Sequence, residues 1–227
     1  MLEEYSRTHI HALPFDLPES NRTPLSRQIY FGLKRGFDIA ATVAVAPVAL
    51  SLVGALAILV RLDGGRAFYS QPRIGRSGKT FRLWKLRTMV PGAEAKLEQH
   101  LKDNPTARIE WDANQKLRHD PRITTIGGFL RKYSLDELPQ LLNVFLGQMS
   151  LVGPRPMCLD QRSQYPGTAY FELRPGLTGL WQISDRNNCT FTERAMHDTR
   201  YARIMSFQTD LQIMVRTVGV VFRGTGL

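Results

Sequence analysis

The longest apolar stretch of the chain runs from Phe37 to Val60 and contains one charged residue, Asp38. As an α-helix, these 24 residues would be about 36 Å long. That length is enough to cross a membrane hydrocarbon core of about 30 Å. Hydropathy alone therefore predicts a single membrane-spanning helix.

Two features of the same stretch favour a helix that enters the membrane and returns. Pro47 lies near its middle and cannot donate to the carbonyl of Val43, so we expect a kink there. Basic residues flank the stretch equally, whereas a spanning helix keeps most of them on the cytoplasmic side. These residues are Arg22, Arg27, Lys34 and Arg35 before it, and Arg61, Arg66, Arg73 and Arg76 after it. A re-entrant helix keeps both groups on one face.

Beyond residue 60 the pattern changes to short elements of mixed type. Their residues favour strands at 67–71, 80–86 and 149–152, and helices at 93–104, 107–117, 126–133, 136–146 and 190–223. The apolar stripe of the helix at 136–146 consists of Leu138, Leu141, Leu142 and Phe145. The apolar face of 190–223 fits two positions, docked on the core or laid against a bilayer.

These elements predict an α+β fold class. We expect a re-entrant, proline-kinked membrane helix and a compact, mainly helical cytosolic domain with a few short strands and amphipathic helices at the membrane surface. The predicted parts are a polar N-terminal segment at 1–32, the membrane helix at 33–62 and the cytosolic domain at 63–227.

The charge balance of the chain points to anionic partners. It has 30 Lys and Arg against 20 Asp and Glu, a net charge of +10. Eight basic residues and one acid lie between Arg61 and Arg87, directly after the apolar stretch. That position favours a membrane surface over nucleic acid. The two cysteines, Cys158 and Cys189, have no zinc-site spacing and are expected to be free thiols.

An acidic pair stands in Ser134-Leu135-Asp136-Glu137, after two basic residues. Two interpretations fit this spacing. In a capping box, Ser134 is the N-cap of a helix and Glu137 reaches back from the third helical position. Alternatively, the helix N-terminus binds a phosphate, and Asp136 attacks it to give an acyl phosphate.

A carboxylate that attacks a phosphate needs nearby positive charge, because the two groups repel each other. The candidates are Lys85, Arg87, Arg131 and Arg155, with Mg2+ bridging Asp136 and the phosphate oxygens. Arg155 lies in Gly153-Pro154-Arg155-Pro156, where two prolines stiffen the backbone.

Two further polar clusters lie outside this group. Asp185-Arg186-Asn187 would suit a phosphate or a sugar. His119-Asp120 reads as surface, because no other His or Asp supports a metal site there.

Together these segments resemble the bacterial sugar transferase family, the monotopic phosphoglycosyl transferases that act on polyprenol phosphate. The chain looks like the short members that start exopolysaccharide repeat units, such as the succinoglycan galactosyl-phosphate transferases. The resemblance covers about residues 33–223 and rests on five ordered motifs. They are Lys34-Arg35-Gly36-Phe37-Asp38, Lys85-Leu86-Arg87-Thr88-Met89, the segment 130–141 around Ser134-Leu135-Asp136-Glu137, the segment 149–156 ending in Gly153-Pro154-Arg155-Pro156, and Arg174-Pro175-Gly176-Leu177-Thr178-Gly179-Leu180-Trp181-Gln182.

The resemblance implies a membrane helix kinked at Pro47, an Asp136-Glu137 catalytic dyad and Mg2+ held by Asp136. It implies that Asp136 attacks the β-phosphate of a UDP-sugar, that UMP leaves, and that polyprenol phosphate then takes the sugar phosphate. Glu137 would be a metal ligand or a base. The residues expected around the phosphates and the nucleotide are Lys85, Arg87, Arg131, Pro154, Arg155, Pro156 and Arg186.

The implied partners are a UDP-sugar, polyprenol phosphate and membrane lipid at the cytoplasmic face of the bacterial inner membrane, with no nucleic acid. Galactose and glucose are the expected sugars, and a homo-oligomer is compatible with the resemblance. The competing hypothesis uses the charge balance alone. It is a non-catalytic basic module, anchored by a spanning helix, that binds anionic lipid or nucleic acid.

Overall fold

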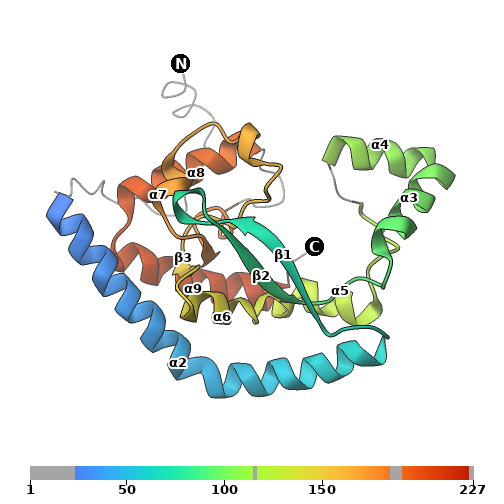
Figure 1. The fold of residues 1–227 in the computed structure, drawn as a ribbon, viewed down its shortest axis with the longest axis horizontal. Coiled ribbons are helices and arrows are strands. Elements are labelled where there is room, and N and C mark those ends of the chain that lie inside the picture. Colours follow the sequence, from blue (N-terminus) through green and yellow to red (C-terminus); the bar gives the residue numbers. More distant parts are fainter. Residues whose placement is uncertain (1–23, 115–116, 185–190, 225–227) are drawn as a thin grey trace.

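The computed structural model of the chain describes residues 24–114, 117–184 and 191–224, and Figure 1 shows their arrangement. One long helix, α2, lies along one side of a body built from short helices and two small sheets. The elements of the body are β1 (Phe68–Ile74), η1 (Arg76–Gly78), β2 (Thr80–Leu86), α3 (Ala93–Asp103), α4 (Pro105–Asn114), α5 (Thr125–Lys132), η2 (Leu135–Glu137), α6 (Gln140–Phe145), β3 (Ser150–Val152), η3 (Arg162–Gln164), α7 (Ala169–Glu172), β4 (Gly176–Thr178), α8 (Phe191–Ile204) and α9 (Phe207–Arg223).

Helix α2 (Pro24–Leu62) is continuous through Pro47 but bends in its middle, so that two arms curve around the body (Figure 1). The missing N–H of Pro47 explains a bend without a break. Its start at Pro24 lies nine residues before the predicted beginning of the membrane segment at residue 33. The stretch Leu25–Leu62 is long and apolar enough to cross a membrane by length and composition.

Both arms of α2 are attached to the same body. On the first arm, Arg35 donates to the carbonyls of Val144 and Phe145 at 2.6 and 2.8 Å, and Asp38 accepts from Leu151 N at 3.1 Å. The second arm buries Leu56 and Val60 in an apolar cluster with Ala67, Leu86 and Leu130. A straight spanning helix would hold its two ends a membrane thickness apart.

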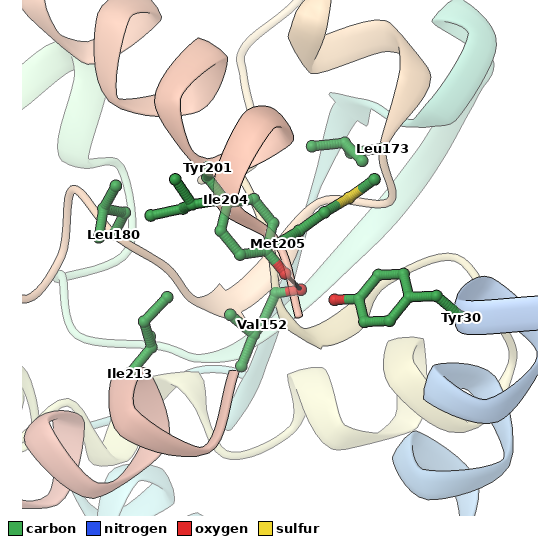
Figure 2. Packing of buried hydrophobic residues seen from close by; sticks show 8 residues of the cluster. All are labelled: Tyr30, Val152, Leu173, Leu180, Tyr201, Ile204, Met205 and Ile213. Carbon is green, nitrogen blue, oxygen red and sulfur yellow. Dashed lines mark hydrogen bonds between the residues drawn. The ribbon is translucent and has the colours of Figure 1, made fainter. Parts of the chain in front are cut away.

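The main apolar cluster joins α2 to the C-terminal helices. Figure 2 shows Tyr30 from α2 pointing toward Val152, Tyr201 and Met205. Asp210 of α9 accepts from Tyr30 Oη at 2.8 Å, from Tyr201 Oη at 2.6 Å and from Lys34 Nζ at 2.5 Å. Three donors on one buried carboxylate offset the cost of removing that charge from water.

The strands form two separate sheets. β1 and β2 are an antiparallel hairpin in which Phe68 pairs with Leu86 and Ile74 with Thr80, close to the predicted 67–71 and 80–86. β3 and β4 are parallel, with Ser150 opposite Gly176 and Val152 opposite Thr178. The sequence pattern did not predict β4, because three residues that begin with glycine carry no alternation.

The predicted helix at 136–146 is wrong in its extent and in the face that it buries. The structure has the 3₁₀ turn η2 followed by α6, and α6 buries Gln140, Asn143 and Val144. Leu142 and Phe145, from the predicted apolar stripe, are exposed. The polar inner face has a physical reason, because Asn143 accepts from Trp84 N at 3.1 Å and donates to Arg82 O at 2.7 Å, which satisfies the backbone of β2.

The helices predicted at 93–104, 107–117 and 126–133 are present as α3, α4 and α5 with ends shifted by up to three residues, whereas α7 was not predicted. The segment 190–223 is two helices, and Ser206 caps the second by accepting from Thr209 N. Helix α9 leaves large apolar side chains exposed along one face, and they are Phe207, Leu211, Val215, Val218 and Phe222. Helices α3 and α4 stand to one side, beyond α5 (Figure 1).

Candidate active site

The Asp-Glu pair is carried by the junction between α5 and α6. Thr124 caps α5 by accepting from Gly127 N at 2.9 Å. Gly127 packs directly on the backbone of Thr88, two residues after the end of β2, since a Cβ there would lie 2.0 Å from the carbonyl oxygen of Thr88. This close approach places the segment that follows α5 next to Lys85 of β2.

The capping box predicted at Ser134 does not form. Ser134 has a φ of 54°, in the left-handed region, and its side chain makes no capping hydrogen bond. The left-handed residue turns the chain sharply into η2, so Asp136 points into the body and Glu137 lies beside it. The segment whose spacing matches a capping box therefore forms a 3₁₀ turn, and this turn orients the carboxylates of Asp136 and Glu137.

Lys85 joins the two carboxylates. Its Nζ lies 2.8 Å from Glu137 Oε1 and 3.3 Å from Asp136 Oδ2. Arg155 Nη2 lies 3.3 Å from the same Glu137 oxygen. Asp136 is only 6% exposed, whereas the Arg155 side chain is 35% exposed and can meet an incoming anion.

Burial raises the pKa of Asp136, and the neighbouring charge of Glu137 adds to the rise. Lys85 and Arg131 act in the opposite direction and favour the carboxylate. Burial also lowers the pKa of Arg131. Burial dominates, so the pKa of Asp136 is raised overall, and Lys85 and Arg131 limit this rise and favour the ionised form that a nucleophile requires.

Arg131 is held from two sides. Its Nε donates to Thr88 Oγ1 at 2.9 Å, and its charge interacts with those of Asp136 and Asp120. Asp120 is not the surface residue that its sequence context predicted, since its side chain is 6% exposed and Arg122 Nη2 lies 2.6 Å from its Oδ2. Although burial acts to raise it, the pKa of Asp120 is lowered by the hydrogen bonds from Arg122.

Arg155 lies in the segment that directly follows β3, beside the parallel pair that β3 forms with β4. Pro154 and Pro156 are buried, and their rings restrict the backbone on both sides of Arg155. Gly176 N donates to Pro154 O at 2.7 Å, and a Cβ on Gly176 would lie 2.1 Å from Gly153 N. Gly153 and Gly176 therefore have no room for a side chain.

Two other residues predicted to bind substrate are not seen with the dyad. Arg87 donates to the backbone carbonyls of Arg66, Met89, Val60 and Gly64. It holds the end of α2 and the following loop to β2, and none of these bonds reaches a carboxylate. Arg186, with its neighbours Asp185 and Asn187, lies outside the described residues.

The structure also brings in three residues to which the sequence reasoning gave no role. Thr88 receives Arg131, and the Trp181 ring receives the guanidinium carbons of Arg155 and Arg194, each 5.6 Å from its centroid. Trp181 lies in the motif at 174–182, so the sequence did contain a signal that could have placed it near the site. Arg194 had none beyond its i, i+4 spacing from Asp198.

Asp136 and Glu137 are the residues that could hold Mg2+. Within the described ranges no three His, Cys, Asp or Glu side chains form a metal-binding group. Mg2+ is commonly bound by one or two carboxylates together with substrate phosphates. Two adjacent carboxylates therefore fit an ion whose coordination is completed by a phosphorylated substrate.

Comparison with known proteins identifies a family to which the chain is similar. A family model described as "Bacterial sugar transferase" matches residues 29–224. The exopolysaccharide production protein ExoY of Rhizobium meliloti is 44% identical over 97% of this chain and 98% of its own length. The undecaprenyl-phosphate galactose phosphotransferase of Salmonella typhimurium is 43% identical over 86% of this chain. The UDP-glucose:undecaprenyl-phosphate glucose-1-phosphate transferase of Caulobacter vibrioides is 35% identical over 86% of this chain and 72% of its own length.

The relatives differ in size. The chain spans 41% of the Salmonella protein and less than half of several other relatives, but nearly all of ExoY. The shared region contains both the dyad and the bent helix.

Proposed function

Because the chain belongs to the bacterial sugar transferase family, we propose that it transfers a sugar-1-phosphate from a UDP-sugar to undecaprenyl phosphate and releases UMP. This is the first membrane step in building an exopolysaccharide repeat unit. The names of the Salmonella and Caulobacter relatives, which describe transfer of a sugar phosphate to undecaprenyl phosphate, support the assignment.

One observation carries the chemistry, namely a buried Asp136 carboxylate whose Oδ2 lies 3.3 Å from the Lys85 ammonium and beside Glu137. An Asp136 oxygen attacks the β-phosphorus of the UDP-sugar. A carboxyl–phosphorus bond forms, the bond from that phosphorus to the bridging oxygen breaks, and the bridging oxygen leaves with UMP. An oxygen of undecaprenyl phosphate then attacks the same phosphorus, which frees the Asp136 carboxylate. One phosphoanhydride is consumed and one is made, so the two-step reaction needs no other energy source.

The surrounding cations make the attack of one anion on another feasible. Lys85 lowers the repulsion between Asp136 and Glu137 and helps to keep Asp136 ionised. Arg155 is partly exposed and suits a bidentate contact with the phosphate groups. Arg131, fixed by Thr88, supplies a further positive charge near Asp136.

We assign Mg2+ to the Asp136-Glu137 pair as a part of the substrate complex. When bound there, the ion would neutralise charge on the phosphate oxygens. Glu137 already receives Lys85 and Arg155, so its carboxylate orients these cations as well as contributing a ligand oxygen.

The attachment of both α2 arms to one body supports a re-entrant helix. Its exposed side chains and those of α6 and α9 are largely apolar, including Val48, Leu142, Phe145, Leu211 and Val215. We propose that these helices meet the cytoplasmic face of the inner membrane, where undecaprenyl phosphate presents its headgroup.

Cysteine labelling would test this topology. In a background with Cys158 and Cys189 replaced by serine, single cysteines at the exposed positions Leu25 and Leu62 mark the two ends of α2. We expect a membrane-impermeant maleimide to label neither position in spheroplasts and both after permeabilisation. Labelling of one end alone in intact spheroplasts would establish a spanning helix instead.

The substrate sugar is proposed to be galactose or glucose, following the names of the relatives. The deciding assay measures UMP release from a panel of UDP-sugars with undecaprenyl phosphate and Mg2+. Asp136→Asn should remove turnover and leave the thermal unfolding temperature unchanged. Asp112→Asn, which alters an exposed carboxylate of α4, is the matched control. A protein that binds anionic vesicles but releases no UMP from any donor would favour the basic membrane-anchored module.

A further inference from the structure

A line of contacts extends from α8 to the carboxylate dyad. Asp198 and Arg194 stand one turn apart on α8, and both are buried. Arg194 Nη2 donates to the main-chain carbonyl of Arg155, and the Arg194 guanidinium lies over the Trp181 ring. The Arg155 guanidinium lies over the same ring and reaches Glu137.

Each contact in this line acts on Arg155. The hydrogen bond from Arg194 holds the Arg155 backbone, and the indole of Trp181 holds its side chain. The charges of Arg194 and Arg155 repel each other, while the carboxyl of Asp198 attracts Arg194. Repulsion by the charge of Arg194 and attraction by the carboxylate of Glu137 both direct the Arg155 guanidinium toward the dyad.

Stability alone is a weak reason for a buried cation at this position. Arg194 is 8% exposed, and removing a guanidinium from water is costly unless its partners replace the lost hydration. Apolar side chains of similar size commonly replace buried ion pairs with little or no loss of stability. A role in placing a reacting group is the better explanation, because it requires the charge and the donor together.

We propose that Arg194 is a positioning residue that sets the place of Arg155 against Glu137 through the Arg155 carbonyl and the Trp181 ring. This inference rests on the proposed phosphosugar transfer. It assigns a function in that reaction to a residue of α8 that does not contact the carboxylates in the hydrogen bonds described. Arg194 acts through Arg155, so its effect on turnover disappears once the Arg155 side chain is changed.

A double-mutant cycle tests the proposal in the full chain, purified in detergent or nanodiscs and assayed for UMP release. Arg194→Met keeps an unbranched, largely buried apolar stem and removes the charge and the donors. We expect it to lower kcat by about 10- to 100-fold, as misplacement of a reacting group does. Arg194→Lys should recover part of the loss. Arg162→Met is the matched control, because Arg162 is exposed and stacks on Phe171, away from the dyad.

The decisive measurement is the effect of Arg194→Met in an Arg155→Gln background. If Arg194 acts through Arg155, the double variant is no slower than Arg155→Gln alone. Multiplicative losses would overturn the inference while the transfer activity of the unchanged protein stands. If Arg194→Met does not fold, Arg194→Gln and Arg194→Lys complete the same cycle. An unchanged protein that releases no UMP would overturn the proposed function and this inference with it.

Discussion

The ammonium of Lys85 lies 2.8 Å from Glu137 Oε1 and 3.3 Å from Asp136 Oδ2, so one cation from β2 joins the two carboxylates of η2. Lys85 precedes Asp136 by 51 residues and Glu137 by 52 residues along the chain. Their meeting depends on α5, which packs its Gly127 against Thr88 in the segment that follows the hairpin.

Replacing Lys85 should therefore change both the rate and the pH dependence of turnover. Lys85 lowers the pKa of Asp136 against the effect of burial, so Lys85→Met raises that pKa further. Asp136 must be ionised to attack, and the acid limb of the kcat/KM profile should move to higher pH. We expect a loss of about 100-fold at neutral pH. Lys79→Met, at the exposed turn of the same hairpin, should behave as the unchanged protein.

The contact beneath the site makes a second prediction, on folding. A Cβ at Gly127 would lie 2.0 Å from Thr88 O, a backbone atom that cannot move alone. Gly127→Ala should lower the free energy of unfolding by about 1–3 kcal/mol or prevent folding. Its neighbour offers a matched control, since a Cβ at Gly128 meets only Ile123 Cγ2 at 3.9 Å. Gly128→Ala should be neutral or stabilising by up to about 1 kcal/mol. Equal thermal shifts would contradict the close packing.

Helix α6 offers a third prediction, on which of its faces supports the fold. Asn143→Ala leaves Trp84 N–H and Arg82 O without their side-chain partner, and we expect it to lower the free energy of unfolding by about 1–3 kcal/mol. Leu142→Ala removes an exposed apolar group and should barely change unfolding in detergent. The same Leu142 change should weaken binding to liposomes. A larger fall in unfolding temperature for Leu142→Ala than for Asn143→Ala would contradict the burial of the Asn143 face of α6.

Asp198 makes a fourth prediction, on pH. Burial raises the pKa of Asp198 to about 7, although Arg194 and Tyr165 act to lower it. The pKa of an Asp in the unfolded chain is about 3.9. Between this pKa and that of Asp198 in the folded protein, the folded state binds more protons than the unfolded state. Stability contributed by Asp198 therefore falls as pH rises through this window.

Comparison with Asp198→Asn isolates that contribution. The free energy of unfolding of the unchanged protein, relative to the variant, should decrease from about pH 5 to about pH 7.5 and then level off. Denaturant unfolding at a series of pH values measures the difference. A difference that stays constant over this range would show that Asp198 is ionised throughout.

The sequence by itself determined the features that depend on local pattern. The apolar stretch and Pro47 gave the long bent helix, and alternation gave the β1–β2 hairpin. The ordered motifs gave the family, and the Asp136-Glu137 pair follows from them. These features need only neighbouring residues, because helix periodicity, proline geometry and strand alternation are properties of short segments.

Only the tertiary structure decided which side chains face one another. Periodicity assigned the apolar stripe of α6 to the core, yet Asn143 is inside because the edge of β2 needs its hydrogen bonds. Charge and the family resemblance suggested Arg87 as a phosphate contact, and only the structure shows that its guanidinium donates to carbonyls of the α2 end and its loop. Arg194 acquired its place from a carbonyl 39 residues earlier. A buried polar group goes where its partners are, and those partners come from segments that no local pattern connects.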